Sequence, residues 1–328
     1  LVEYFRGNAK LLAEDGYFTD FISNGVSTEL CFVAFCAFTL IIIFAGVQNG
    51  IERVSKIMMP ILIVLSVIIA VYSVTRPGAL AGVKYFLVPN VKNFSWMTVV
   101  SAMGQMFYSL SIAMGILITF GSYMKKDTAI EDSTRNVEVF DTGIAIMAGL
   151  MIIPAVFAFS GGDPDTLQAG PSLMFITIPK VFQNMGFGTV IGIVFFLLVL
   201  FAAVTSSIAL TESAVSTFED ELGWGRKKAT VLVGVIMLVL GSLSSLGYGP
   251  LAGIKIIGMQ FLDLFDFLTN SVMMPIAALL TSLLVSRVVG IDKIEEEIIH
   301  GESAFRRKKV FVVMIKYLCP VFAIIILL

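Results

Sequence analysis

Eight long apolar runs dominate the chain and are separated by shorter polar segments. The runs fall near residues 29–47, 57–75, 96–124, 139–160, 187–218, 229–247, 262–289 and 309–328. A helix needs about 20 mainly apolar residues to cross a bilayer, and its backbone groups are satisfied within the segment. The runs also lack the alternation of membrane strands. The pattern therefore predicts an all-α, polytopic membrane protein with about eight transmembrane helices.

The composition supports this class and excludes several others. Hydrophobic residues make up 57% of the chain and charged residues 14%, and the mean hydropathy is +0.94. About a quarter of a soluble domain is charged, so this chain could not cover a water-soluble globule. The net charge of −2 gives no reason to expect a nucleic-acid partner. The lipid bilayer is the expected partner.

Metal and disulfide chemistry are not expected from the histidine and cysteine residues. His300 is the only histidine and lies in a charged segment, which excludes a multi-histidine metal site. The three cysteines, Cys31, Cys36 and Cys319, lie in or beside apolar runs without metal or disulfide spacing. Small packing residues are the better interpretation.

The basic residues between the runs predict the orientation in the membrane. One set of connections holds Arg53, Lys56, Lys125, Lys126, Arg135, Arg226, Lys227, Lys228, Arg287, Lys293, Arg306, Arg307, Lys308 and Lys309. The alternate set holds Arg6, Lys10, Arg76, Lys84, Lys92, Lys180 and Lys255. Fourteen bases against seven place the first set in the cytoplasm.

We expect a single transmembrane transporter domain over residues 1–328 that is incomplete at the N-terminus. The chain opens on Leu1 in a polar segment, without an initiator methionine, and ends inside an apolar run. Residues 161–185 form a long external connection with its own apolar stretch. Such a loop could fold as a lid over an external vestibule, and an ordinary surface loop is an equal alternative.

Polar residues inside two runs are candidates for ion or substrate binding. Run 96–124 carries Gln105, Ser109 and Ser111 near its middle, followed by Gly115. These residues weaken a continuous helix and could leave backbone groups facing a cavity, as in discontinuous transporter helices. Alternatively, the serine hydroxyls bond back to their own helix.

A polar stripe in run 187–218 can be interpreted either as a cation site or as a packing surface. Thr205, Glu212 and Ser216 lie on one helical face. Hydroxyls and an acid suit coordination of a small hard cation, and they also suit helix–helix packing. Asp141 is a further candidate because the chain becomes apolar directly after it.

Several strings together resemble the neurotransmitter:sodium symporter family, whose bacterial members carry amino acids. The resembling strings are NGIERVSKIMMPIL at 49–62, GQMFYSLSIAMG at 104–115, TFGSYMKKD at 119–127, IIPAVFAFSGG at 152–162, AAVTSSIAL at 202–210 and FEDELGW at 218–224. The resemblance implies the inverted-repeat symporter fold with discontinuous helices. The eight runs then match family helices four to eleven, and the missing N-terminal helices of the same protein would be a further partner.

The resemblance also implies sodium-binding residues. The first sodium site would be formed by Ser109 and Asp141. The second would be formed by Ala202, Thr205 and Ser206, with Ala202 contributing its carbonyl oxygen. This sequence has Asp141 where the well-known leucine-transporting member has Asn, which leaves a proton or chloride role open.

Substrate and gate residues follow in the same way. The amine of the substrate would be held by Tyr108, Ser109 and Ser111. The pocket walls would be Met114, Ser206 and Leu210. The external gate would contain Gln105, Tyr108 and Asp266, and the internal gate Tyr123 and Asp220. Ala113 stands where the leucine-transporting member has a pocket glycine.

The expected function is sodium-coupled symport of an amino acid or related zwitterion across the cell membrane by alternating access. Such a protein is not an enzyme and needs no cofactor beyond sodium as the coupling ion. One alternative is a proton-coupled or ion-conducting protein in which Asp141 and Glu212 form a relay. A membrane-embedded enzyme lacks a supporting residue cluster. A non-transporting fragment is the remaining alternative.

Overall fold

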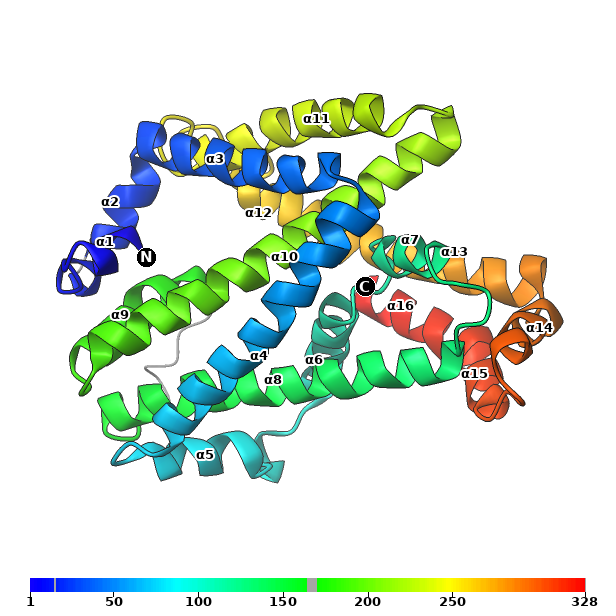
Figure 1. Cartoon of the computed structure of the whole chain (residues 1–328). Helices are drawn as coiled ribbons and strands as arrows, with labels where there is room; N and C mark the ends of the chain where they lie inside the picture. The colour runs from blue at the N-terminus through cyan, green and yellow to red at the C-terminus, as the bar shows by residue number, and fades with distance from the viewer. Residues whose placement is uncertain (15, 164–169, 328) are drawn as a thin grey trace. The chain divides into compact units, whose positions relative to one another are not determined.

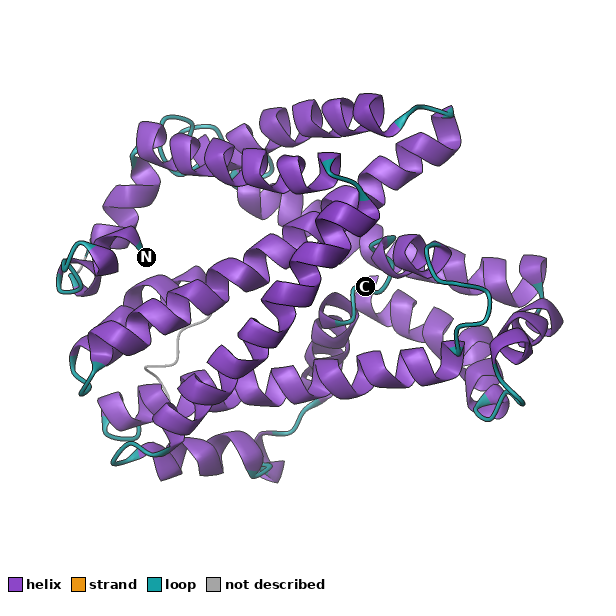
Figure 2. Ribbon diagram, in the orientation of Figure 1, coloured by secondary structure: helices purple, strands orange, loops and turns teal. Residues whose placement is uncertain are grey.

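The computed structural model describes residues 1–14, 16–163 and 170–327, and these are almost entirely helical (Figure 2). No strand occurs among them, and Ile256 and Met259 form an isolated β-bridge. The predicted all-α class is therefore confirmed.

Seven of the predicted runs form helices that are long and apolar enough to cross a membrane. In the described parts of the chain these helices are Gly25–Phe44, Val47–Val74, Ile130–Ser160, Gly188–Leu222, Arg226–Leu246, Phe261–Val289 and Lys308–Leu327. The remaining run, 96–124, forms two shorter helices with a break between them. The expected discontinuous helix is thus present.

The chain forms two compact units, which we describe separately. The first unit comprises Leu1–Val91, Gly143–Thr211 and Thr230–Ile254. It contains α1 (Val2–Phe5), α2 (Tyr17–Ser23), α3 (Gly25–Phe44), α4 (Arg53–Val74), α5 (Ala79–Leu87), α9 (Ile178–Gln183) and most of α8 (Ile130–Ser160), α10 (Gly188–Leu222) and α11 (Arg226–Leu246), which Figure 1 labels. Short helical turns at Leu11–Ala13, Val47–Glu52 and Leu173–Thr177 complete it.

The core of the first unit lies among α4, α8, α9 and the first half of α10. Its buried residues include Ile69, Val156, Val181, Phe182 and Phe195. Phe182 meets Phe195 edge to face at 5.4 Å between ring centroids. The short helix α9 therefore packs by its apolar side chains rather than lying loose on the surface.

Backbones approach closely where α5 meets α8. A Cβ atom added to Gly82 would lie 2.8 Å from the Cα atom of Pro154, which is too close for a real contact. Glycine is therefore needed at this position for packing rather than for its backbone freedom.

The second unit comprises Lys92–Thr142, Glu212–Ala229 and Lys255–Leu328. It contains α6 (Trp96–Ser109), α7 (Ile116–Ser122), α12 (Phe261–Asp266), α13 (Met274–Leu283), α14 (Ile291–Gly301), α15 (Lys308–Val313), α16 (Cys319–Leu327) and the beginning or end of α8, α10 and α11. Wider helical turns at Phe267–Met273, Leu284–Val289 and Met314–Leu318 join α12, α13, α15 and α16 into the continuous apolar helices.

Helix α6 is placed by a polar start and an apolar end. Ser95 and Thr98 exchange hydrogen bonds with each other's backbone in a capping box, which defines the first turn. At the other end, Phe107 is buried in a cluster with Met274, Ala278 and Ala323 of α13 and α16. The end of α6, where the helix breaks, is thus anchored to the long helices of its unit.

The predicted lid-like loop, 161–185, is helical over part of its length. Residues 164–169 lie outside the described residues. The apolar stretch forms the turn Leu173–Thr177 and helix α9, whose Ile178, Val181 and Phe182 join the core of the first unit. Its role as a lid stays a prediction.

Candidate functional site

The break in run 96–124 is a six-residue segment between two short helices. Helix α6 ends at Ser109 and α7 begins at Ile116. Within the segment, Ser111, Ala113 and Gly115 have left-handed backbones, with φ of 54°, 64° and 78°. Alternating left-handed residues cannot continue a right-handed helix. The amides of Ser111 and Ile112 instead donate to the carbonyl oxygens of Tyr108 and Phe107 at 3.1 and 3.0 Å, outside the regular helical register.

Two hydroxyl groups, one from α10 and one from α7, form hydrogen bonds at the C-terminal end of this segment. Ser213 on α10 donates to the carbonyl oxygen of Met114 at 3.4 Å, and Thr119 donates to Ser213 at 3.4 Å. A Cβ atom on Gly115 would lie 2.6 Å from the Ser213 hydroxyl. Glycine therefore serves both the left-handed turn and the close approach of α10.

The near end of the segment carries the pair Ser109 and Asp141. The Ser109 hydroxyl donates to a carboxylate oxygen of Asp141 at 2.6 Å, a length typical of a charge-assisted bond. The two residues come from α6 and α8 and are 32 positions apart in the chain. The structure thus joins the two residues assigned to the first sodium site. Three oxygen atoms at this point suit a hard cation.

The residues assigned to the second sodium site lie in the first unit, on α10. The Thr205 hydroxyl donates to the carbonyl oxygens of Phe201 and Ala202, each at 3.0 Å. Thr205 and the Ala202 carbonyl are therefore brought together. Ser206 and Leu210 lie on an exposed face of the same helix. In this geometry Thr205 bonds back to its own helix.

Glu212 has a partner that the sequence did not reveal. Its side chain is 0% exposed, and Arg226, at the start of α11, donates to both carboxylate oxygens at 3.0 and 2.5 Å. Tyr123 donates a third bond at 2.7 Å. A lone acid inside an apolar run needs a partner for its charge. The first basic residue after Glu212 in the sequence is Arg226, so this rule could have predicted the pair. The carboxylate is neutralised by arginine and is not open to a sodium ion.

The predicted gate residues are only partly connected. Tyr123 contacts Glu212. Asp220 lies exposed on the last turns of α10. Asp266 accepts a bond from Asn270, one turn further along its helix, at 2.6 Å. No hydrogen bond joins Asp266 to Gln105 within the described part of the chain. Tyr108 is exposed at the end of α6, next to Ser109.

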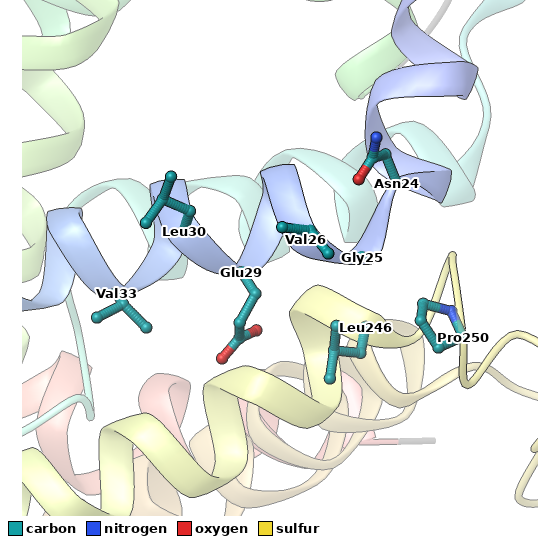
Figure 3. A pocket seen from close by; sticks show the side chains of 8 residues that line it. All are labelled: Asn24, Gly25, Val26, Glu29, Leu30, Val33, Leu246 and Pro250. Atoms are coloured by element: carbon teal, nitrogen blue, oxygen red, sulfur yellow. The ribbon is translucent and has the colours of Figure 1, made fainter.

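An apolar hollow in the first unit is lined by none of these residues. It has a volume of about 600 Å³ and lies between the start of α3 and the end of α11. Figure 3 shows its lining residues, with the Glu29 side chain directed toward α11. Ser242 donates to Glu29 at 2.5 Å, so the acid serves mainly to join the two helices.

Comparison with known proteins identifies this arrangement. The sequence profile of the sodium:neurotransmitter symporter family matches residues 2–328. The chain belongs to this family. An uncharacterized sodium-dependent transporter of Bacillus subtilis, YhdH, is 34% identical over 307 residues, which are 93% of this chain and 67% of that protein. An uncharacterized sodium-dependent transporter of Methanocaldococcus jannaschii is 30% identical over 264 residues, 79% of this chain and 52% of that protein.

A solved symporter structure supports the family membership through its fold. The crystal structure of MhsT in complex with L-phenylalanine matches with a TM-score of 0.84 and 32% identity, over 99% of this chain and 74% of that one. The chain therefore spans about half to three quarters of the length of these relatives. It is an integral membrane protein of a transporter family.

Proposed function

We propose that this protein carries out sodium-coupled symport of an amino acid, or a related small zwitterion, across the cell membrane by alternating access. The family and its sodium-dependent relatives support sodium as the coupling ion. The amino acid is suggested by MhsT, which was solved with L-phenylalanine. Asp141 and the break at 110–115 are the part of this chain on which the proposal rests.

The bond between Ser109 and Asp141 carries the proposal. It places a carboxylate and a hydroxyl at the point where α6 ends, 2.6 Å apart. Asp141 is half-buried and Ser109 is exposed within their unit. A carboxylate in a membrane-spanning helix is nevertheless costly unless a cation or a strong donor compensates its charge. A single neutral hydroxyl compensates only part of that charge. A sodium ion bound to both oxygens would complete the compensation.

The broken segment could present backbone carbonyl oxygens to a zwitterion, as discontinuous transporter helices do. A substrate ammonium group would be held by carbonyl oxygens near Tyr108, Ser109 and Ser111. The substrate carboxylate would approach the sodium ion at Asp141, so ion and substrate would stabilise each other's binding. By the family resemblance, the wall around the side chain of the substrate would include Met114, Ser206 and Leu210.

A second sodium ion would bind to α10 at Ala202, Thr205 and Ser206. The Thr205 hydroxyl now donates to the Ala202 carbonyl. Binding requires the hydroxyl hydrogen to turn away, so that both oxygen atoms face the ion. This rearrangement breaks a hydrogen bond, and it makes the second ion's affinity sensitive to the local helix geometry.

The decisive experiment measures sodium dependence in two single variants. Asp141→Asn keeps the shape of the side chain and removes its charge, and Ser109→Ala removes the hydroxyl. We expect the sodium concentration for half-maximal uptake of a radiolabelled amino acid to rise about tenfold in Asp141→Asn, because one charge-assisted contact of about 1.5 kcal/mol is lost. Ser133→Ala, which removes a hydroxyl bonded to its own helix, is the matched control.

The same variants are tested for sodium-dependent thermal stabilisation, which needs no transport. A ligand that binds the folded protein raises its melting temperature. Sodium chloride, compared with potassium chloride, should stabilise the unmodified protein and the control, and Asp141→Asn much less. An unchanged response to sodium in Asp141→Asn would contradict the assignment of this residue. A rate set by pH rather than by sodium would favour the proton-coupled alternative.

A further inference from the structure

We propose that the start of the last apolar helix binds an anionic lipid, with the phosphate between Arg306 and Lys309 and an acyl chain along the helix face below them. The run Arg306–Lys309 consists of four consecutive bases, of which the last two begin the apolar helix Lys308–Leu327. Clusters of basic residues at the membrane edge of a helix attract anionic headgroups. The contacts around this run make it a built surface rather than a loose tail.

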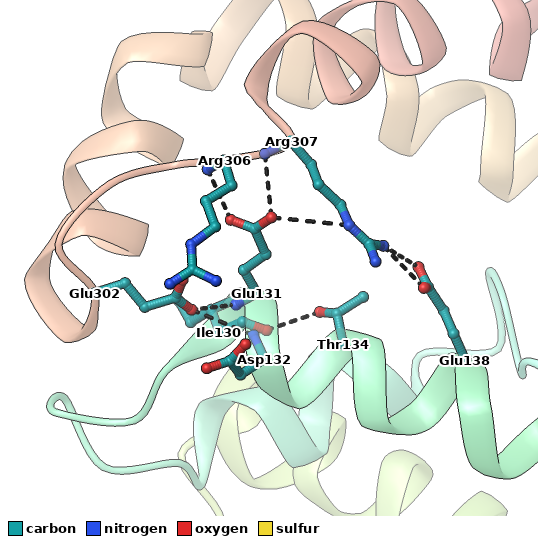
Figure 4. Close-up of polar contacts among 8 residues, drawn as sticks. All are labelled: Ile130, Glu131, Asp132, Thr134, Glu138, Glu302, Arg306 and Arg307. Atoms are coloured by element: carbon teal, nitrogen blue, oxygen red, sulfur yellow. Dashed lines mark hydrogen bonds and ion pairs between the residues drawn. The ribbon is translucent and has the colours of Figure 1, made fainter.

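A reciprocal clasp fixes the backbone of this segment against α8 (Figure 4). The Glu131 carboxylate accepts bonds from the backbone amides of Arg306 and Arg307 at 2.9 and 3.1 Å. In return, the Glu302 carboxylate accepts a bond from the Glu131 amide at 2.6 Å, at the start of α8. The segment before α15 is thus held at two points, which lowers the entropy lost when it binds a ligand.

Two of the four bases pair with acids through their side chains. The Arg307 guanidinium donates to both carboxylate oxygens of Glu138, at 3.2 and 2.9 Å. This bonding raises the pKa of Arg307 above its ordinary value. Lys308 pairs with Glu295 on α14. Arg306 and Lys309 are exposed, and their side chains take part in none of these contacts.

An apolar stripe continues from the two exposed bases along the helix. Val310, Val313 and Tyr317 follow one another at spacings of three and four residues, which places them on one helical face, and Lys309 precedes Val313 by four residues. Their exposed fractions are 63%, 49% and 65%. A positive head with an apolar stripe below it matches an amphiphile, with a phosphodiester at the bases and a hydrocarbon chain along the stripe.

The occupant inferred is a membrane lipid rather than a free phosphate ion. A free anion would use the bases alone and would gain nothing from Val310, Val313 and Tyr317. The phosphodiester of a lipid such as phosphatidylglycerol carries one negative charge and can accept bonds from both Arg306 and Lys309. The headgroup then sits at the membrane surface, where the helix enters the hydrocarbon.

The test uses the whole chain reconstituted in nanodiscs that contain phosphatidylglycerol and phosphatidylcholine. After transfer to detergent, native mass spectrometry counts the phosphatidylglycerol molecules that remain bound. The variant Arg306→Gln/Lys309→Gln removes both proposed contacts and leaves the clasp intact. Lys125→Gln/Lys126→Gln removes the same charge from a loop that does not lead directly into a helix. Val313→Asn tests the apolar stripe separately.

We expect Arg306→Gln/Lys309→Gln to weaken retention on the order of thirtyfold, from two headgroup contacts, while Lys125→Gln/Lys126→Gln retains lipid as the unmodified protein does. Val313→Asn should also weaken retention, and added inorganic phosphate should not displace the lipid. Equal retention in both double variants would overturn the proposal. Displacement by inorganic phosphate, with no effect of Val313→Asn, would show an anion site without a lipid and would also overturn it. Thermal melting of each variant checks that the fold is kept.

Discussion

Backbone strain at single residues occurs in the break between α6 and α7, as well as at Phe187 and Ile257. Ser111 and Ala113 adopt left-handed backbones without the freedom of glycine. Such a conformation costs roughly 1–2 kcal/mol in a residue with a Cβ atom. Strain of this size persists only where the surrounding contacts impose it, here the bonds to Asp141 and from Ser213. The break is therefore a property of the packed unit as well as of its sequence.

Replacing Ala113 with glycine tests this interpretation. Ala113→Gly relieves the left-handed strain and adds back unfolded-state entropy worth about 0.4–1 kcal/mol. We expect a net gain in the free energy of unfolding of about 0.5 kcal/mol. Thermal melting in detergent, followed by far-ultraviolet circular dichroism, measures the change.

The matched control is Ala102→Gly in the regular part of α6. Glycine in a helix interior is less favourable than alanine by about 1 kcal/mol, so this variant should melt at a lower temperature. The prediction fails if both substitutions destabilise the protein equally, because Ala113 would then gain as much from a Cβ atom as a helical residue does.

At the scale of elements, the corner between α10 and α11 depends on one buried ion pair. Glu212 lies in the last third of α10, Arg226 begins α11, and Tyr123 follows α7, so three elements meet at one carboxylate. Arg226 also approaches Glu219 at 3.5 Å. A buried pair of this kind contributes little net stability compared with apolar residues, but its disruption is costly.

Removing one partner of this pair should therefore lower the free energy of unfolding more than removing both partners does. Arg226→Met leaves the Glu212 carboxylate buried and should lower the free energy of unfolding by about 3–5 kcal/mol. The double variant Glu212→Gln/Arg226→Met removes both charges and should recover a large part of this loss. Chemical unfolding of the two single variants and the double variant gives the coupling energy.

If the losses in unfolding free energy of the two single variants add up to the loss of the double variant, Glu212 and Arg226 do not interact directly. The control is Lys227→Met, which removes a neighbouring base that lies exposed on α11. It should change the free energy of unfolding by no more than about 0.5 kcal/mol.

The sequence predicted elements well where apolar periodicity alone decides them. The seven long helices agree with apolar runs, and the glycine and serine residues near 109–115 indicated the break. Contacts between distant elements were less accessible. The Arg226–Glu212 pair and the clasp of Glu131 with Glu302 join side chains and backbone amides, and no local pattern encodes such partners. Ser109 and Asp141 were assigned to one site only through the family resemblance, and their part in a sodium site stays a prediction.

At the scale of the whole molecule, the membrane determines which surface the protein must present. Many large apolar side chains are exposed on the helices, among them Phe38, Ile68 and Leu280. A water-soluble protein rarely shows apolar patches of this extent, whereas in a bilayer they face lipid. The lipid-facing surface is thus encoded by composition, while the ion-binding residues are few and need tertiary contacts to become recognisable.

The orientation of the chain follows from charge rather than from packing. Fourteen bases lie in one set of connections and seven in the other. The positive-inside rule places the richer set, with Lys227, in the cytoplasm and Lys84 outside. In a variant whose three cysteines are replaced by serine, we expect a membrane-impermeant maleimide to label Lys84→Cys in intact cells. It should label Lys227→Cys only after the membrane is permeabilised.

Both reporter positions are exposed, so the difference in labelling reports the side of the membrane rather than burial. The cysteine-free variant gives the background. Labelling of Lys227→Cys in intact cells, with Lys84→Cys protected, would invert the topology. The bases Arg306 and Lys309 would then lie at the outer leaflet. Helix α8, which contains Asp141, begins beside these bases at the clasp, so Asp141 would lie nearer the outer membrane surface. The orientation experiment therefore also decides to which membrane surface Asp141 lies nearer.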